Sequence, residues 1–233
     1  MAPLVPEDAR REIKFVTRRS HYEQLKDWLF HNQAFFRIAY PDRAVNNIYF
    51  DTHNYDAYDA NLSGRSGRTK VRYRWYGKDP QPEAGKLEIK HKRNMFGWKT
   101  LFPIPVAPWH EHISWINLKR IISDHLPIEG KLWLQHHPVP IIINRYEREY
   151  YLSSDGLVRV TIDKNQTVLD QRRKSQPNLT MSVALPDIII VEIKFHRSER
   201  ERASEIIQGI PIRASAYSKY VSGVHAVSGN NTW

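Results

Sequence analysis

The sequence predicts an α+β fold in which about eight antiparallel strands close into a barrel or pack as a sandwich, with helices at the ends and edges. Three observations favour this class. Cationic and apolar residues alternate in KVRYRWYG at 70–77, which is typical of a strand. Ser20 and Glu23 have the spacing of a helix-capping box and precede an apolar stripe. The stretch SSDG at 153–156 separates two long strand-like runs and indicates a hairpin.

The other elements follow from the same patterns along the chain. The predicted strands are 12–17, 46–50, 68–76, 86–92, 98–104, 140–152, 157–163 and 187–196. The predicted helices are a segment that starts at Ser20, 55–62, 109–125, 198 to about 208, and 214–224. Residues 164–186 are polar and contain two prolines, so we expect a loop there. No Pro- or Gly-rich linker divides the chain, which predicts a single domain over 1–233.

The composition restricts both the chemistry and the partners of the protein. The 35 Lys and Arg residues outnumber the 25 Asp and Glu residues, and the net charge of +10 favours an anionic partner such as nucleic acid, a membrane surface or a phosphate-rich ligand. The absence of cysteine excludes disulfides, thiolate nucleophiles and cysteine-bound zinc. The N-terminus lacks the apolar stretch of a signal peptide, and the apolar runs are too short to span a bilayer. We therefore expect a soluble, cytoplasmic protein.

Charged side chains share one face in six of the predicted strands. Lys70, Arg72 and Arg74 alternate with apolar residues, and a solvated surface is the commoner explanation for any single strand. Across all six strands Lys and Arg dominate, and the acids are few and isolated, which favours a wet barrel lumen instead. Burial of so many cations is prohibitive unless the lumen holds a polyanion such as a triphosphate or polyphosphate. Glu192, on the same face as Lys194, would then anchor a divalent metal.

Histidines and aromatic residues support two weaker interpretations. The histidines at 110–112 and 136–137 lack HxxxH or HExxH spacing, so a metal site made from them is disfavoured. Aromatic side chains could stack the bases of single-stranded nucleic acid. Tyr73 and Trp75, however, fall on the face opposite the cations, and one groove cannot use both faces. Core packing is therefore favoured for these two residues, and no specific nucleic-acid partner is expected.

Nine short motifs along the chain occur together in one known family. They are REIKF (11–15), VNNIYFDT (45–52), KVRYRWYG (70–77), LEIKHK (87–92), GWKT (97–100), RYEREYY (145–151), VRVTID (158–163), VEIKF (191–195) and YSKYVSG (217–223). Each motif is weak alone, but nine in the same order are specific. From about Arg11 to Val224 the chain resembles the VTC (vacuolar transporter chaperone) domain, the polyphosphate polymerase branch of the triphosphate tunnel metalloenzyme (CYTH-like) superfamily.

This resemblance implies an eight-stranded antiparallel β-barrel that forms a basic tunnel, with helices packed outside and at the ends. It also implies an ATP:polyphosphate phosphotransferase, which moves the γ-phosphate of ATP onto a growing polyphosphate chain with Mn²⁺ or Mg²⁺. The implied catalytic residues are Lys14, Arg72, Arg74, Lys90 and Lys219, and the implied metal ligand is Glu192. The implied phosphate-binding residues are Lys92, Lys99, Arg148, Arg159, Lys194, Tyr146 and Ser218.

Departures from the family pattern bear on the reaction. The hydrolytic branch of the superfamily carries an ExExK motif on its first strand, and here Glu12 and Lys14 match its last two positions, whereas Arg10 replaces the first Glu. This difference favours a polymerase over a tunnel triphosphatase or tripolyphosphatase, and a non-catalytic module that binds polyphosphate or RNA is a third interpretation. The yeast-type relatives add a phosphate-sensing SPX domain and membrane helices, for which we expect no room in this chain. Export of a product would then need a separate membrane partner.

Overall fold

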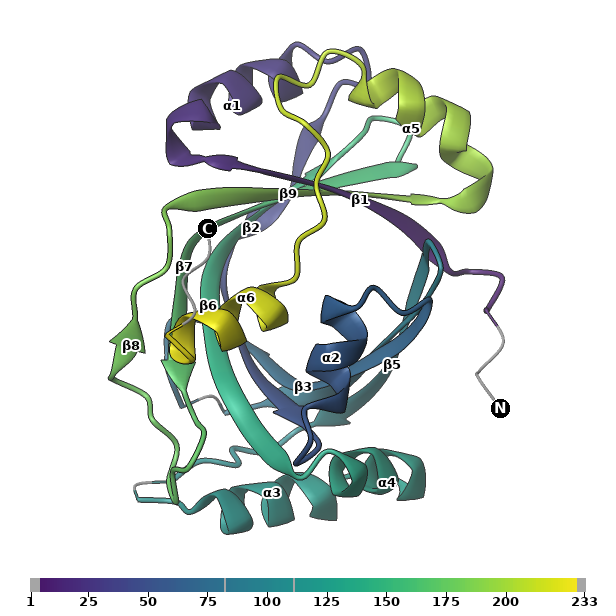
Figure 1. Cartoon of the computed structure of the whole chain (residues 1–233). Coiled ribbons are helices and arrows are strands. Elements are labelled where there is room, and N and C mark those ends of the chain that lie inside the picture. The colour runs from purple at the N-terminus through teal and green to yellow at the C-terminus, as the bar shows by residue number, and fades with distance from the viewer. Residues whose placement is uncertain (1–4, 82, 111, 230–233) are drawn as a thin grey trace.

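One antiparallel sheet that closes on itself dominates the computed structural model, which describes residues 5–81, 83–110 and 112–229 (Figure 1). Its strand order is β6-β2-β3-β4-β5-β1-β9-β7-β8, and β6 also pairs with β7, so eight strands complete a ring. The strands are β1 (Arg10–Arg18), β2 (Arg37–Asp51), β3 (Gly67–Tyr76), β4 (Gly85–Arg93), β5 (Phe96–Ile104), β6 (Val139–Leu152), β7 (Val158–Asp170), β8 (Ser182–Val183) and β9 (Ile188–His196). The predicted α+β class and the antiparallel arrangement of eight strands are confirmed.

Helices surround this ring and cover one of its ends. They are α1 (Tyr22–Phe30), α2 (Asp56–Leu62), α3 (Trp115–Asp124), α4 (Ile128–His136), α5 (Arg200–Ile207) and α6 (Lys219–Val227), with short 3-10 turns at Arg19–His21 and Arg197–Glu199. In Figure 1, α1 and α5 lie above the ring, α3 and α4 lie below it, and α2 and α6 lie across its opening. Within the described residues, no helix has the length and apolar character needed to cross a membrane.

The outer face of the ring is apolar because alternate residues of each strand point away from its interior. Tyr73 and Trp75 on β3 are buried against α3 and α4, so the prediction that they are core residues is confirmed. On the opposite side, Val160 of β7 and Val191 of β9 pack beneath α1 and α5. Helices on both sides therefore cover the apolar faces, and the polar faces of the strands point inward.

Two features attach α2 and α6 to the strands at their end of the ring. One is the buried Asp51 carboxylate, and the other is the close approach of the α6 backbone to β6. Asp51 on β2 accepts hydrogen bonds from the Ala57 N–H of α2 at 2.9 Å and from the Tyr220 hydroxyl of α6 at 2.6 Å. Gly223 of α6 lies so close to β6 that an added Cβ would stand 2.5 Å from Ile142 Cδ1. The two helices are thereby fixed against the inner wall at this end.

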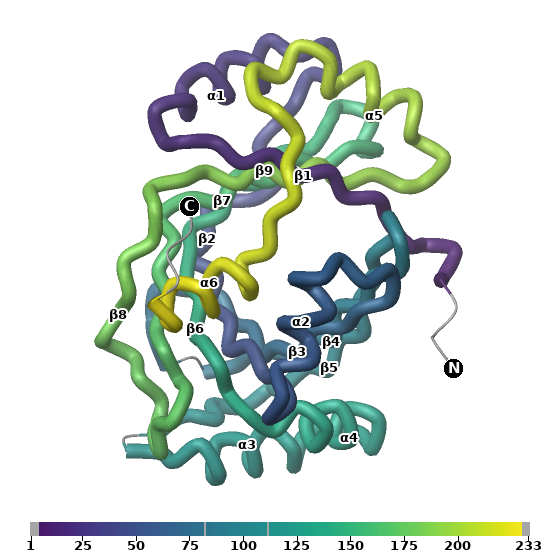
Figure 2. The backbone as a smooth tube through the Cα atoms, in the orientation of Figure 1, coloured from purple at the N-terminus to yellow at the C-terminus, as the bar shows by residue number. Residues whose placement is uncertain are grey.

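The ring is joined unevenly around its circumference. Strand β1 pairs with β9 along its whole length but with β5 through only two residue pairs, at Arg10 and Arg11. Beyond these pairs, the segment that links α5 to α6 crosses β1, as Figure 2 shows. In this crossing segment (residues 208–218), the Ser215 N–H donates to the Lys14 carbonyl at 2.9 Å. The β1–β5 junction, called the seam from here on, is thus the weakest hydrogen-bonded join in the ring.

Two strands are longer than predicted. The predicted loop over 164–186 is wrong at its start, because β7 continues to Asp170. A register irregularity with Asn165 at φ 54° interrupts the alternation, and beyond it Val168 and Leu169 are buried. Strand β2 begins at Arg37 rather than at 46, and its early residues are mostly exposed around two register shifts, which conceals them in the sequence pattern.

The predicted helix over 109–125 begins later than expected. The structure places only Trp115–Asp124 in α3, because the Ser114 side chain accepts a hydrogen bond from the Asn117 N–H at 3.2 Å and caps the helix there. The last helix likewise begins at Lys219 rather than at 214, since Ser218 caps it. Helix α4 was not predicted. The later starts of α3 and α6 both follow from capping by a serine side chain, which the pattern of apolar residues does not reveal.

A buried carboxylate on the outer face anchors α1 to the sheet. Glu149 accepts hydrogen bonds from Tyr22 Oη and Tyr151 Oη, each at 2.6 Å, from Lys26 Nζ at 3.1 Å, and from Lys164. Burial raises the pKa of Glu149, but these four donors outweigh burial and lower the pKa to about 2. The folded state therefore binds the ionised form more favourably than the unfolded chain does.

We expect Glu149→Gln to lower the free energy of unfolding by about 3 kcal/mol at pH 7, because it leaves two lysines facing a neutral group. The carboxylate contributes its full stability above the unfolded pKa of about 4.3 and loses it as the pH falls through the folded pKa. The difference between wild type and variant, measured by urea unfolding, should therefore shrink between about pH 4 and pH 2. Glu147→Gln, at an exposed position on the same strand, is the control and should change stability by less than about 0.5 kcal/mol. A pH-independent difference would contradict this prediction.

Candidate functional site

The interior of the ring is lined by charged side chains that the strand register brings to one face. The paired residues include Lys14 with Glu192, Arg72 with Glu88, and Arg148 with Asp163. The lining cations of the strands include Lys14, Arg68, Lys70, Arg72, Arg74, Lys90, Lys92, Lys99, Arg148, Arg159 and Lys194, and the lining acids include Glu12, Glu88, Asp163 and Glu192. Lys219 adds a further cation from the first turn of α6. Cations clearly outnumber acids among these residues, so the interior is basic.

One group of these side chains gathers around Glu88. Arg72 donates to Glu88 Oε2 from Nε at 2.9 Å and from Nη2 at 2.5 Å, and Arg74 and Lys99 lie 3.7 and 3.5 Å from the same oxygen. Arg74 is only 3% exposed, and it also donates from Nη2 to the Tyr146 hydroxyl at 3.1 Å. Three cations therefore share one carboxylate, and their remaining N–H groups can donate to a further anion.

A second group surrounds Glu192 and Asp163. Lys219 Nζ lies 2.5 Å from Asp163 and 3.7 Å from Glu192, and Arg148 forms a bidentate pair with Asp163 at 2.5 and 2.6 Å. Lys194 lies 2.5 Å from Glu192, and Lys14 lies 3.6 Å from it. Burial raises the pKa of Glu192, but these four cations outweigh it and lower the pKa well below its usual range. Glu192 is thus ionised and sits where positive charge converges.

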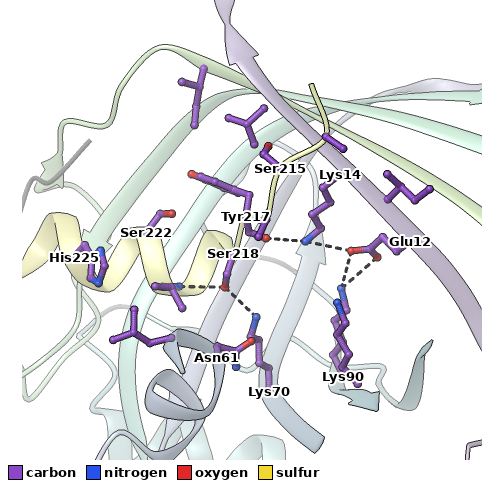
Figure 3. A pocket seen from close by; sticks show the side chains of 18 of the residues that line it. Glu12, Lys14, Asn61, Lys70, Lys90, Ser215, Tyr217, Ser218, Ser222 and His225 are labelled. Atoms are coloured by element: carbon purple, nitrogen blue, oxygen red, sulfur yellow. Dashed lines mark hydrogen bonds and ion pairs between the residues drawn. The ribbon is translucent and has the colours of Figure 1, made fainter. Parts of the chain in front are cut away.

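The opening near α6 leads into a cavity of about 1420 Å³ (Figure 3). Lys14 Nζ donates to the Tyr217 carbonyl at 3.0 Å and lies 3.1 Å from Glu12, while Lys90 lies 3.4 Å from Glu12. Lys70 Nζ donates to the Ser218 hydroxyl at 2.9 Å. Lys14, Lys70 and Lys90 at this opening therefore already contact protein oxygen atoms. An incoming anion would have to replace those oxygen atoms as their partner.

The excess of cations shifts the ionisation of the lysines at the opening. Burial, and then the charges of Lys90 and Lys14, lower the pKa of Lys70 well below its usual range. Glu12 raises the pKa of Lys90, but burial and the charge of Lys14 outweigh it, and the pKa falls to about 8. A bound polyanion would reverse these shifts by supplying the missing negative charge.

Binding of a polyanion should therefore take up protons. We expect the affinity for tripolyphosphate to fall as the pH rises from about 7.5 to 9.5, by up to about tenfold per pH unit for each fully coupled lysine. Calorimetry in buffers of different ionisation enthalpy should show net proton uptake near pH 8.5. The control is Lys90→Arg with Lys70→Arg, in which the guanidinium groups stay charged and the pH dependence should flatten. An unchanged slope in this variant would refute the assignment to these two lysines.

The structure brings together the site residues that the family resemblance implies. Lys14, Arg72, Arg74, Lys90, Lys92, Lys99, Tyr146, Arg148, Arg159, Lys194 and Glu192 lie on the inner face of the strands, and Ser218 and Lys219 lie at the start of α6. Arg159 differs from the rest because its buried Nε has no hydrogen-bond partner in the described part of the chain.

The expectation that the interior acids are isolated is wrong. Each of the four acids contacts two or more cations, because inward-facing side chains of different strands converge across the ring. Asp163, Glu88 and Lys70 fell on the charged faces of their predicted strands but were not assigned to the site, yet each contacts a residue of the charged lining or of α6. Their period-two placement with assigned residues was the signal that could have found them.

A resident metal does not fit the donor set, whereas a metal carried by a phosphate ligand does. In residues 5–81, 83–110 and 112–229, no cluster of three His, Cys, Asp or Glu side chains could hold an ion. Both oxygens of Glu192 face cations, but those near Oε1 are farther away, with Lys14 at 3.6 Å and Lys219 at 3.7 Å, than Lys194, which lies 2.5 Å from Oε2. Oε1 is therefore the oxygen that could take a metal carried by phosphates. Mg²⁺ commonly binds through one or two carboxylates and takes its other ligands from substrate phosphates and water. Glu192 is suited to that arrangement.

Comparison with known proteins identifies the family. A model of the VTC domain matches residues 9–228. The chain belongs to the VTC-domain family. No curated protein matches it in sequence. Among solved structures, this VTC domain is similar to a candidate adenylate cyclase from Vibrio parahaemolyticus, with 12% identity, a TM-score of 0.53, and coverage of 92% of this chain and 97% of that one. It is also similar to the PH1819 protein from Pyrococcus horikoshii OT3, with 11% identity, a TM-score of 0.47, and coverage of 91% and 96%.

The family match covers every part of the VTC domain that contributes to the charged interior. It includes β1, which supplies Glu12 and Lys14, and α6, which supplies Lys219. The interior is therefore a feature of the matched domain itself and not of an appended segment. At 12% identity, the solved neighbour supports the ring architecture alone.

Proposed function

We propose that this VTC domain is a metal-dependent polyphosphate polymerase, which transfers the γ-phosphate of ATP to a growing inorganic polyphosphate chain inside a basic tunnel. The observation that supports this most is the convergence of buried cations on Glu192 and Asp163. Such a surplus of buried cations is costly unless an anion of high charge completes it. Phosphates spaced along a chain match cations spaced along rigid strands.

The reaction needs little covalent chemistry from the protein. Phosphoryl transfer depends mainly on in-line positioning and on stabilising the equatorial oxygens of the transferred group. Arg72 and Arg74, which now contact Glu88 and Tyr146, would donate to the phosphate oxygens from one side of the interior. Arg148 and Lys219, which now contact Asp163, would donate from the other side. The acceptor, a terminal phosphate, is already anionic and needs no strong general base. In this proposal the cations exchange their carboxylate partners for phosphate oxygens when substrate binds.

A divalent ion, Mn²⁺ or Mg²⁺, would bridge phosphates and offset developing charge when bound. Glu192 would hold it, while Asp163 keeps Lys219 and Arg148 aligned beside it. Lys14, Lys90 and Lys92 would bind phosphates nearer the α6 opening, and Lys99, Arg159, Lys194, Tyr146 and Ser218 would complete the lining.

One experiment separates the polymerase from its alternatives. The purified protein is incubated with ATP and Mn²⁺, and ADP, free phosphate, long-chain polyphosphate and cyclic AMP are measured together, with Glu192→Gln as the control. ADP and polyphosphate without matching free phosphate are expected. Free phosphate in step with ADP would instead indicate a tunnel triphosphatase, and cyclic AMP would indicate the activity named for the Vibrio neighbour. Tripolyphosphate binding without any turnover would reduce the protein to a polyanion-binding module.

A further inference from the structure

Aromatic side chains and an arginine gather at the rim of the ring opposite α6. The Arg43 guanidinium carbon lies 5.2 Å from the ring centroid of Tyr40, and 5.8 Å from those of Tyr76 and Tyr150. Tyr40 and Tyr150 meet edge to face at 5.6 Å, and Lys86 Nζ lies 5.3 Å from the Tyr76 centroid. We call Tyr40, Arg43, Tyr76 and Tyr150 the tyrosine–arginine rim.

Packing does not account for these rings. Tyr40 is 44% exposed and Tyr76 is 40% exposed. None of the three core clusters of the described residues includes Tyr40, Tyr76 or Tyr150. Tyr40 and Tyr76 thus leave much of their side-chain surface in solvent, whereas Tyr150 is partly buried, and the Arg43 guanidinium lies against all three rings.

The tyrosine–arginine rim continues directly from the phosphate-binding candidates. Tyr76 lies two residues beyond Arg74 on the same face of β3, and Tyr150 lies two residues beyond Arg148 on β6, a step of about 7 Å in each case. Arg43 is paired in register with Arg148 across β2 and β6. A ligand that lies on these rings can therefore place an attached phosphate chain on Arg74 and Arg148.

We propose that the tyrosine–arginine rim stacks the base of a nucleoside triphosphate whose phosphates enter the ring over Arg74 and Arg148. This inference rests on the proposed function, because it names where the donor nucleotide of that same site binds. Bases stack on aromatic rings and on the arginine guanidinium through their π faces, which all four bases possess. The site should therefore prefer large purine rings and discriminate little between adenine and guanine.

The test compares a ligand that has a base with one that lacks it. Tyr40→Leu with Tyr76→Leu removes two π faces, keeps apolar bulk and changes no charge. Calorimetry is expected to show a rise of about 5- to 100-fold in the Kd of ATP and less than twofold in the Kd of tripolyphosphate. Tyr217→Leu, at the α6 opening, probes the other end of the ring. The matched control is Phe35→Leu, which removes a 73% exposed aromatic ring between α1 and β2 and should leave both affinities unchanged.

Three other outcomes would overturn the proposal. Equal weakening of ATP and tripolyphosphate would mean that the rim only supports the phosphate-binding residues. Selective loss of ATP affinity in Tyr217→Leu would place the base at the other opening. Failure of the wild-type protein to bind either ligand would reject both this inference and the proposed function. Selective loss of ATP affinity in the rim variant without any turnover would support the base site and reject the polymerase alone.

Discussion

Replacing Arg74 by alanine is expected to lower turnover by about 10²- to 10³-fold, since Arg74 is one of the pre-organised donors to the transferred phosphate in the proposed reaction. The same change should cost only modest stability, chiefly because the buried Asn47 Oδ1 loses the donor that lies 2.7 Å from it. Glu88, the acid nearest to Arg74 Nη1, keeps Arg72 at 2.5 Å and Lys99 at 3.5 Å, so no carboxylate is left without a cation. Removal of one charge also relieves repulsion among the remaining cations. We expect Tm to fall by no more than about 4 °C.

The measurement pairs steady-state turnover of ATP with thermal unfolding of the same preparations. Arg120→Ala is a matched control, because Arg120 is an exposed cation on α3 outside the ring. It should leave both turnover and Tm unchanged. A large fall in Tm for Arg74→Ala, with normal turnover of the folded fraction, would show that Arg74 is structural.

Glu192→Gln, in contrast to Arg74→Ala, should lower stability strongly as well as turnover. Four cations lose a shared negative partner, so we expect the free energy of unfolding to fall by about 3–5 kcal/mol. Mn²⁺-dependent turnover should fall at least about 10²-fold, because the carboxylate proposed to hold the metal is gone. Tripolyphosphate without metal should bind more tightly than in wild type, since one repulsive charge has been removed.

A matched variant separates the metal effect from the loss of a buried acid. Glu88→Gln also removes an interior carboxylate that pairs with three cations, but it is not proposed to hold the metal. Both variants should regain stability when tripolyphosphate is added, because ligand binding favours the folded state. Only Glu192→Gln should lose the dependence of turnover on Mn²⁺ concentration. The same loss in both variants would contradict the role assigned to Glu192.

The sequence predicted the strands best where polar and apolar residues alternate. In β3 the period of two separates Arg72 and Arg74 from Tyr73 and Trp75, and the structure keeps that separation. Because the helices cover the apolar faces of the strands, the polar faces must point into the interior of the ring. This step from alternation to a charged interior was therefore available from the sequence.

The contacts inside the ring could not be predicted in the same way. Asp163 meets Lys219 because α6 starts at the opening and directs its first side chain inward, which depends on the path of the crossing segment. Asn165, with a positive φ, changes the alternation in β7 and hid the rest of that strand. Such features depend on register and backbone geometry between distant residues, and local patterns do not encode them.

The seam has a consequence for how long a polymer stays with the protein. A polymer that passes through a continuous ring is threaded and can leave only by sliding out along its own length. Here β1 and β5 share only two residue pairs, and an ion pair between Glu12 of β1 and Lys90 of β4, at 3.4 Å, lies beside them. Sideways escape would need these contacts and the crossing segment to move apart while the other strand pairs stay intact. In the polymerase proposed above, the residence time of a long chain would therefore depend on the opening of the seam as well as on the attraction between cations and phosphates.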